Sequence, residues 1–296
     1  MKEWLIRLVV GAAVVVVVVI VATWIAGGDL VGPANRDVGR PPADLEASNV
    51  TFASASGSLI QAWLSRGQPG QGVIILLHGV RGDRRDMLSR AEFLRAKGYS
   101  LLLPDFQAHG ESKGRRVTFG NLESNDVTAA IQYLHHKLPD EKIGVVAGSL
   151  GAAAFVLASD RPSVSAVVLE QMYPTVEQAI AGRARLHLGP VGVMLAPLLM
   201  IQAQSKLQIP ADRLRPIDRM SKIGAPVLII NGTSDQYTTL DDAKALLAVA
   251  PGPKELWAVA GAGHVDLYAF SRAEYERRVS DFLERYMRAA APDSRR

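Results

Sequence analysis

The stretch VVAGSLGAA, residues 145–153, predicts a strand, a sharp turn and a helix in immediate succession. The apolar run 143–147 leads into two glycines that flank Ser149, and the helix-forming run 152–157 follows. Such a turn requires small residues for steric reasons alone. Ser149 is therefore either a nucleophile held at the turn or a small residue where the backbone bends, and the rest of the chain has to decide between the two.

Outward from this stretch, apolar runs of strand length alternate with helix-like segments. The expected strands are 49–55, 58–64, 73–77, 99–104, 142–147, 164–170, 226–230 and 254–259. The expected helices are 85–97, 122–137, 150–159, 240–249 and 266–287. The first two strands form an antiparallel hairpin, while the later, continuously apolar ones suit parallel strands buried on both faces. The chain therefore predicts an α/β domain with a doubly wound, mostly parallel sheet.

One long segment, 174–220, does not fit the alternation. It contains the apolar piece LGPVGVMLAPLLMI, residues 188–201. A crossover of this length usually hosts an insertion, so we expect a helical cap here. The apolar piece has 14 residues and is interrupted by Gly and Pro, which is short for a membrane span.

The N-terminal residues predict a membrane helix. Leu8 to Gly28 carries no charge and includes the run VVVVVVIV, residues 14–21. As a helix this segment is about 31 Å long, close to the hydrocarbon thickness of a bilayer. In lipid, where water is absent, a helix provides hydrogen-bond partners within the segment for the backbone N–H and C=O groups of such a β-branched run. Trp4 and Trp24 lie near its two ends, where indole rings favour the interface.

The charges around this helix predict its orientation. Lys2 and Arg7 precede it, whereas the basic residues after it are mixed with aspartates, which favours a cytoplasmic N-terminus and an extracytoplasmic domain. A signal peptide cleaved near Ala26-Gly27-Gly28 is the alternative, but the apolar run is longer than such peptides usually have. We expect an anchor at 1–28, a Gly- and Pro-rich linker at 29–48, the folded α/β domain at 49–288 with its cap at about 174–220, and a flexible tail at 289–296.

Composition excludes several classes of function. The chain has 296 residues, 48% hydrophobic and 21% charged, which is typical of a globular protein. Its net charge of +4 is scattered along the chain, so no nucleic-acid partner is expected. It has no cysteine, which excludes disulfides, thiolate catalysis and Cys-ligated metals.

Reactive side chains follow four of the expected strands. Ser149 follows 142–147, His78 follows 73–77, Asp235 follows 226–230 and His264 follows 254–259. The carboxyl ends of parallel strands meet at one edge of a sheet, where ligands of open α/β sheets bind. We therefore expect these four side chains at a common site.

These residues and their surroundings resemble the α/β-hydrolase superfamily over Asn49 to Met287. Ser149, Asp235 and His264 occur in that family's order of nucleophile, acid and base. AGSLG matches the family's G-x-S-x-G turn with alanine at the first position. LHGVRGD, residues 77–83, resembles the oxyanion loop, and PDFQAHGES, residues 104–112, resembles the D-x-x-x-H-G-x-S loop that follows the next strand.

The resemblance implies a role for each residue. Ser149 is the nucleophile, His264 the general base, and Asp235 the acid that orients the histidine. The backbone N–H groups of Val80 and Leu150 form the oxyanion hole. Glu170, at the end of its own strand, is the alternative acid.

No cofactor and no metal are expected. His109 and Asp105 are a potential pair of ligands, but no further ligand follows at a suitable spacing. His78 is expected to hold its loop and not to act as a base.

The resemblance implies a serine hydrolase of the bacterial membrane-anchored, lysophospholipase- and serine-aminopeptidase-like group. Its expected substrate is a small-molecule or lipid-like ester, cleaved through an acyl-enzyme as in carboxylesterases. Two alternatives stay open. One is a membrane-tethered peptidase with the same triad, in which Glu170 or Glu177 holds the peptide terminus. The other is a non-catalytic binding module with a hydrolase fold.

Overall fold

The computed structural model describes residues 2–158 and 160–288. Its strands are β1 (Ala34–Asn35), β2 (Ala47–Ala53), β3 (Leu59–Ser65), β4 (Val73–Leu77), β5 (Ser100–Pro104), β6 (His109–Gly110), β7 (Ile143–Gly148), β8 (Ala166–Glu170), β9 (Val227–Gly232) and β10 (Lys254–Val259). Its α-helices are α1 (Lys2–Val31), α2 (Leu88–Ala96), α3 (Glu123–Lys137), α4 (Leu150–Leu157), α5 (Val176–Leu207), α6 (Leu240–Val249), α7 (Leu267–Phe270) and α8 (Arg272–Met287). The tail expected at 289–296 lies outside the described residues.

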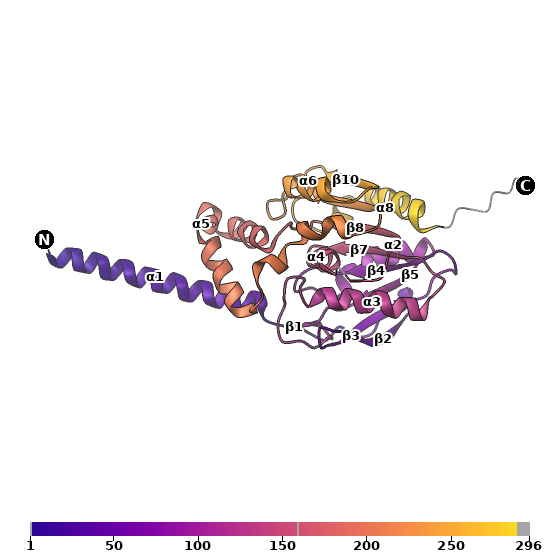
Figure 1. Cartoon of the computed structure of the whole chain (residues 1–296), viewed down its shortest axis with the longest axis horizontal. Coiled ribbons are helices and arrows are strands. Elements are labelled where there is room, and N and C mark those ends of the chain that lie inside the picture. Colours follow the sequence, from indigo (N-terminus) through magenta and orange to yellow (C-terminus); the bar gives the residue numbers. More distant parts are fainter. Residues whose placement is uncertain (1, 159, 289–296) are drawn as a thin grey trace, which may run out of the picture.

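The main sheet has eight strands in the order β10-β9-β8-β7-β4-β5-β3-β2. The neighbours from β10 to β5 are parallel, whereas β3 is antiparallel to both β5 and β2. The predicted fold class is confirmed, including the antiparallel start. Because β7, β8, β9 and β10 are parallel and adjacent, their carboxyl ends form one edge of the sheet (Figure 1).

Helices cover both faces of this sheet, as the continuously apolar strands predict. Successive side chains of a strand point to opposite faces. Accordingly Val73, Ile75 and Leu77 of β4 belong to the core beneath α3, α4 and α6, while Ile74 and Leu76 belong to the core beneath α2 and α8. The strand residues of both cores are buried and closely packed, which gives the strand ends a rigid support.

The expected bounds of β4, β10 and α6 agree with the structure, and other elements differ at their ends. The helix expected at 150–159 ends at Leu157. The single helix expected at 266–287 is divided at Ser271, whose non-helical φ of −140° and ψ of 55° separate α7 from α8. The start of the helix expected at 85–97 is a 3-10 turn, Arg84–Met87, and the α-helix begins only at Leu88.

Helix α1 extends away from the domain and is long and apolar enough to cross a membrane (Figure 1). Its most apolar window has no buried residue. The helix continues to Val31, three residues beyond the expected end of the anchor at Gly28.

The segment expected to be a linker, 29–48, lies against the domain. Ala34 and Asn35 form β1, which pairs in parallel with β6, and the side chains of Val38 and Leu45 are buried. These apolar residues have no periodic spacing, so the sequence does not distinguish the segment from a free tether. The division of the chain into anchor, linker, domain and tail remains a prediction.

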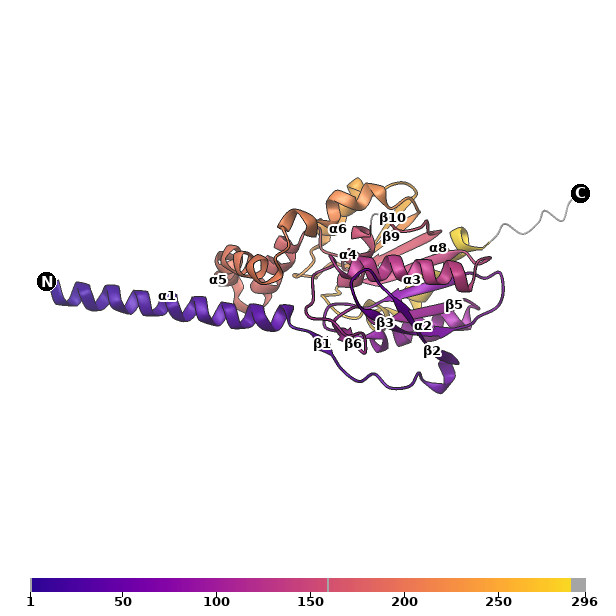
Figure 2. The same cartoon turned by 60° about the horizontal axis from the view of Figure 1, so that its bottom comes forward.

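The expected cap at 174–220 consists of α5 followed by two 3-10 helices, Ala211–Leu214 and Pro216–Lys222. Helix α5 has 32 residues and is kinked at Gly189, whose φ of 58° and ψ of −141° are not helical. Its second half includes the apolar piece 188–201, so the whole helix, unlike that piece, is long and apolar enough to span a membrane. Figures 1 and 2 both show α5 beside the domain-proximal end of α1.

Candidate active site

Ser149 lies at the turn between β7 and α4 in a strained backbone conformation. Its φ of 49° and ψ of −110° are outside the regions that L-residues favour. Its N–H donates to the Glu170 carbonyl at 2.8 Å, which fixes the turn to the end of β8. A non-glycine residue is kept in such a conformation when the surrounding structure imposes it, and this occurs mainly at functional sites.

The neighbours of Ser149 explain the AGSLG pattern. A Cβ at Gly151 would lie 2.6 Å from the Leu77 carbonyl oxygen and 2.8 Å from that of His78, so only glycine lets α4 pack this closely on the end of β4. Ala147, which stands where the family pattern has glycine, is fully buried within β7. The sheet therefore accommodates its methyl group.

Asp235 and His264 form a hydrogen-bonded pair at the same edge of the sheet. His264 Nδ1 donates to Asp235 Oδ2 at 2.8 Å. The other carboxylate oxygen accepts from the N–H groups of Tyr237 and Thr238 at 2.8 and 2.9 Å. Burial opposes the ionisation of Asp235, but the bonds from His264 and Thr238 outweigh it and lower the pKa of this carboxyl. With Nδ1 committed to the carboxylate, Nε2 is the free proton acceptor of His264.

Two further side chains fix this pair. Gln171 Nε2 donates to Asp235 Oδ2 at 3.0 Å and to the Gly263 carbonyl at 2.9 Å, which joins the loop of the acid to the loop of the histidine. The ring of Tyr237 contacts that of His264 edge-on, with centroids 4.6 Å apart. The sequence analysis does not identify Gln171, although its position directly after β8 is a signal of the kind used for the other site residues.

The structure therefore places Ser149, Asp235 and His264 at the carboxyl ends of β7, β9 and β10. Of the hydrogen bonds among the described residues, none joins Ser149 Oγ to His264 Nε2. Catalytic contacts of this kind are often long in the absence of substrate and tighten when it binds.

The loop after β4 lies directly beside Ser149, since a Cβ at Gly79 would be 3.8 Å from the Ser149 Cβ. In the loops and turns of residues 2–158 and 160–288, no backbone hydrogen bond uses the N–H of Val80 or Leu150. Leu150 is the first residue of α4, where N–H groups have no partner within the helix. The oxyanion role assigned to these two N–H groups is consistent with this and stays a prediction.

His78 holds this loop as a neutral side chain. Its Nδ1 donates to the Gly79 carbonyl at 2.8 Å, and the Phe106 N–H donates to its Nε2 at 3.2 Å. Burial lowers the pKa of His78 to about 4, so the ring is neutral at physiological pH. Both ring nitrogens are occupied, and His78 has no free nitrogen for general-base catalysis.

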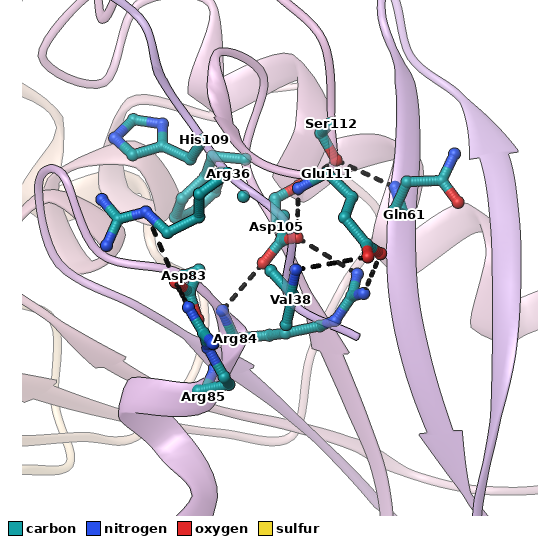
Figure 3. A network of polar contacts seen from close by, with 12 residues as sticks. Arg36, Val38, Gln61, Asp83, Arg84, Arg85, Asp105, His109, Glu111 and Ser112 are labelled. Carbon is teal, nitrogen blue, oxygen red and sulfur yellow. Dashed lines mark hydrogen bonds and ion pairs between the residues drawn. The ribbon is translucent and has the colours of Figure 1, made fainter. Parts of the chain in front are cut away.

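Figure 3 shows a polar network around Asp83 and Arg84, the residues that directly follow this loop. The carboxylate of Asp105, at the end of β5, accepts from the N–H groups of Arg84 and Glu111 at 2.8 and 2.9 Å and pairs with the Arg84 guanidinium at 3.1 Å. Arg84 also pairs with Glu111 and lies 4.7 Å above the ring of Trp63. Burial raises the pKa of Asp105 to about 6, in spite of the opposing charge of Arg84.

The network also reaches the segment that follows α1 (Figure 3). Glu111 accepts from the N–H groups of Val38 and Gly39, and Arg36 pairs with Asp83 at 3.7 Å. Asp83 comes directly after the 78–82 loop. The 78–82 loop is therefore held between the end of β5 and the residues that join α1 to the domain.

Glu170, the alternative acid, is engaged elsewhere. Its carboxylate accepts two hydrogen bonds from Arg90, at 2.6 and 3.1 Å, and a third from the Tyr275 hydroxyl. Glu170 and Arg90 are only 3% and 5% exposed. Burial and the Glu170 charge raise the pKa of Tyr275 well above its ordinary value, which keeps the hydroxyl protonated as a donor. This arrangement points to a structural role for Glu170.

Replacing Glu170 with glutamine is expected to lower the free energy of unfolding by about 3 kcal/mol, because it leaves the buried Arg90 without its main counter-charge. Turnover by the folded enzyme at low temperature should change less than about threefold. Urea unfolding and ester turnover measure the two effects. The matched control is Glu255→Gln, which breaks an exposed pair with Arg285 and should change stability by at most about 1 kcal/mol. A loss of turnover near 10⁴-fold in folded Glu170→Gln would instead identify Glu170 as the acid.

Comparison with known proteins agrees with this geometry. A profile of the alpha/beta hydrolase family matches residues 74–278. YqkD of Bacillus subtilis, an uncharacterised protein, is 23% identical over 244 residues, which cover 81% of this chain and 80% of YqkD. The alpha/beta hydrolase domain-containing protein 17C of Xenopus tropicalis is 26% identical over 246 residues, covering 81% of this chain and 71% of its own.

Solved structures show the same fold. The esterase Pf2001 of Pyrococcus furiosus superposes with a TM-score of 0.71 at 24% identity, covering 87% of this chain and 98% of Pf2001. The alpha/beta hydrolase GrgF of Penicillium superposes with a TM-score of 0.64 at 22% identity, covering 81% of this chain and 99% of GrgF. Since the family profile spans well over half of the sequence, from β4 into α8, this protein belongs to the alpha/beta hydrolase family.

Proposed function

We propose that the protein is a serine hydrolase that cleaves esters through Ser149, His264 and Asp235. The observation that supports this best is the Asp235–His264 pair, which leaves Nε2 free on the same sheet edge where Ser149 is held in a strained turn. A histidine fixed in this tautomer is what a serine nucleophile requires. Membership of the alpha/beta hydrolase family supports hydrolase activity.

The mechanism follows from the positions of these groups. Ser149 Oγ attacks the ester carbonyl carbon while His264 Nε2 takes the hydroxyl proton. The charge that develops on the carbonyl oxygen is met by the N–H groups of Val80 and Leu150 and by the positive end of α4. His264 then gives its proton to the alkoxide that leaves, which releases the alcohol and forms the acyl-enzyme. A water molecule then attacks the acyl-enzyme, with His264 again accepting a proton and returning it to Ser149 Oγ, and the acid is released. In total, one ester and one water become one acid and one alcohol.

The membrane is the second part of the proposal. Helix α1 is the anchor, with its N-terminus in the cytoplasm and the domain outside, as the charges of Lys2 and Arg7 favour. An anchored esterase with an apolar cap is suited to acyl-chain or lipid-like esters, in the manner of carboxylesterases and lysophospholipases. Among the similar structures, the proteins from Pyrococcus furiosus and Exiguobacterium antarcticum are described as esterases.

Labelling with two fluorophosphonate probes tests both parts. Spheroplasts that express the protein are treated with a membrane-impermeant or a permeant probe, and the adduct is located by mass spectrometry. Both probes are expected to modify Ser149. Labelling by the permeant probe alone would support the serine mechanism but place the domain in the cytoplasm. No labelling of folded protein by either probe would favour a non-catalytic binding module. A panel of esters and peptide amides then separates an esterase from a peptidase.

A further inference from the structure

A large apolar cavity lies between the N-terminal helix and the cap. It has a volume of about 700 Å³, which is within the range of small-molecule binding sites. Val19, Ala22 and Leu30 of α1 line one side, and Ile180, Leu195 and Leu199 of α5 line the other. Figures 1 and 2 show these two helices side by side, with the domain at one end of the pair.

Two residues of the cavity wall, Arg81 and Arg183, lie next in sequence to residues that approach the candidate catalytic site. Arg81, which follows the oxyanion donor Val80, lines the cavity and donates from Nη1 to the Asp29 and Gly32 carbonyls at the end of α1. On the opposite side Arg183 also lines the cavity, and the adjacent Gly182 packs so closely on Tyr237 that a Cβ would lie 2.3 Å from its carbonyl oxygen. The ring of Tyr237 contacts His264, as described above.

The contact between α1 and α5 extends along α1 over a length equal to the thickness of one bilayer leaflet. Gln202 Nε2 donates to the Ile20 carbonyl at 3.2 Å, and the Lys206 ammonium lies 4.0 Å from the centroid of the Trp24 ring. Ile20 precedes Asp29 by nine residues, which corresponds to about 14 Å of helix. This is about half of the hydrocarbon thickness of a bilayer.

The outer surface of α5 is apolar as well. Six large apolar side chains of this helix are exposed, namely Leu186, Leu188, Val191, Val193, Met194 and Ile201. Arg185 and His187 are exposed in the same stretch, and Leu188 also lines the cavity. Exposed apolar side chains in this number on a helix beside a membrane span suit contact with acyl chains.

We propose that the cavity between α1 and α5 holds the acyl chain of a membrane lipid ester, while α5 lies in the same leaflet. This proposal rests on the ester hydrolysis proposed above and identifies its substrate class. The chain enters from the leaflet between the two helices, and the ester group reaches Ser149 between Arg81 and Tyr237. The membrane helix thus forms one wall of the substrate site.

The test uses the full-length protein in nanodiscs and the substitution Ala22→Trp. Ala22 lines the cavity from α1 and is exposed, so a larger side chain fills the space without disturbing the core of the domain. Ala13→Trp is the matched control, because Ala13 is an exposed residue of the same helix outside the cavity. Turnover is measured with nitrophenyl acetate and nitrophenyl palmitate. Binding of a fluorescent fatty acid is measured in the Ser149→Ala background, where no turnover occurs.

Ala22→Trp is expected to lower kcat/KM for the palmitate ester at least about tenfold more than kcat/KM for the acetate ester, and to weaken fatty-acid binding at least about tenfold. Ala13→Trp should change none of these. Unchanged binding in Ala22→Trp, or an equal loss in Ala13→Trp, would overturn the proposal. If no ester is turned over by the unsubstituted protein, the proposed hydrolysis fails, and the binding measurement still decides whether the cavity holds an acyl chain.

Discussion

Replacing Ser149 with alanine is expected to lower kcat for the best ester by about 10⁴- to 10⁶-fold. The change removes the only nucleophile at the turn and leaves the Asp235–His264 pair intact. The fold should tolerate it, since both residues have the same Cβ and the same strain at a φ of 49°. The free energy of unfolding should therefore change by less than about 1 kcal/mol.

Steady-state turnover, fluorophosphonate labelling and thermal unfolding measure these effects together. Ser271→Ala is the matched control, because Ser271 lies at the α7–α8 junction and its side chain caps neither helix. That variant should keep full turnover and full labelling. A Ser149→Ala protein that is folded and still hydrolyses esters within tenfold of the original rate would exclude the serine mechanism.

Replacing Asp235 with asparagine is expected to lower kcat by about 10⁴-fold with little change in KM. Two backbone N–H groups already bind Oδ1, so the amide of asparagine must present its NH₂ group to His264. Nδ1 then becomes an acceptor, and the ring carries its proton on Nε2, where it cannot take one from Ser149. kcat falls because His264 carries its proton on the wrong nitrogen, whereas substrate binding is unaffected.

The control for this substitution is Asp281→Asn, which removes an exposed charge on α8. It should leave turnover unchanged. Asp235→Asn also alters the bonds from Gln171 and Thr238, so a loss of stability of about 1 kcal/mol should accompany the slower turnover. Turnover within tenfold of the original in folded Asp235→Asn would mean that another carboxylate orients the histidine, and the contrast with Glu170→Gln would then identify it.

Patterns within one element made much of this fold predictable. The run VIILL at Val73 to Leu77 is apolar at every position because both of its faces are buried, so its bounds are clear from the sequence. The placement of Ser149, Asp235 and His264 at one edge of the sheet is predictable for a related reason, because the topology brings polar groups that follow buried parallel strands to the same edge. Their catalytic roles stay a prediction.

Features that depend on tertiary contact were not predictable. The segment 29–48 has the composition of a tether, and only its pairing with β6 and the burial of Val38 and Leu45 fix it to the domain. Gln171 and Glu170 are neighbours at the end of β8, yet Gln171 donates a hydrogen bond to Asp235 whereas Glu170 accepts one from Arg90. Their roles depend on which helices and loops lie opposite, and periodicity does not contain that information.

The attachment between α1 and the domain has a mechanical consequence. The helix runs on to Val31, and three residues later β1 pairs with β6, so little slack chain separates the two. With α1 fixed in a bilayer, the domain cannot rotate freely about its stem. Under the proposed anchoring, the sheet edge that carries Ser149 would keep a constant orientation toward the lipid surface, and the proposed lipid substrate would be reached by a search in two dimensions instead of three.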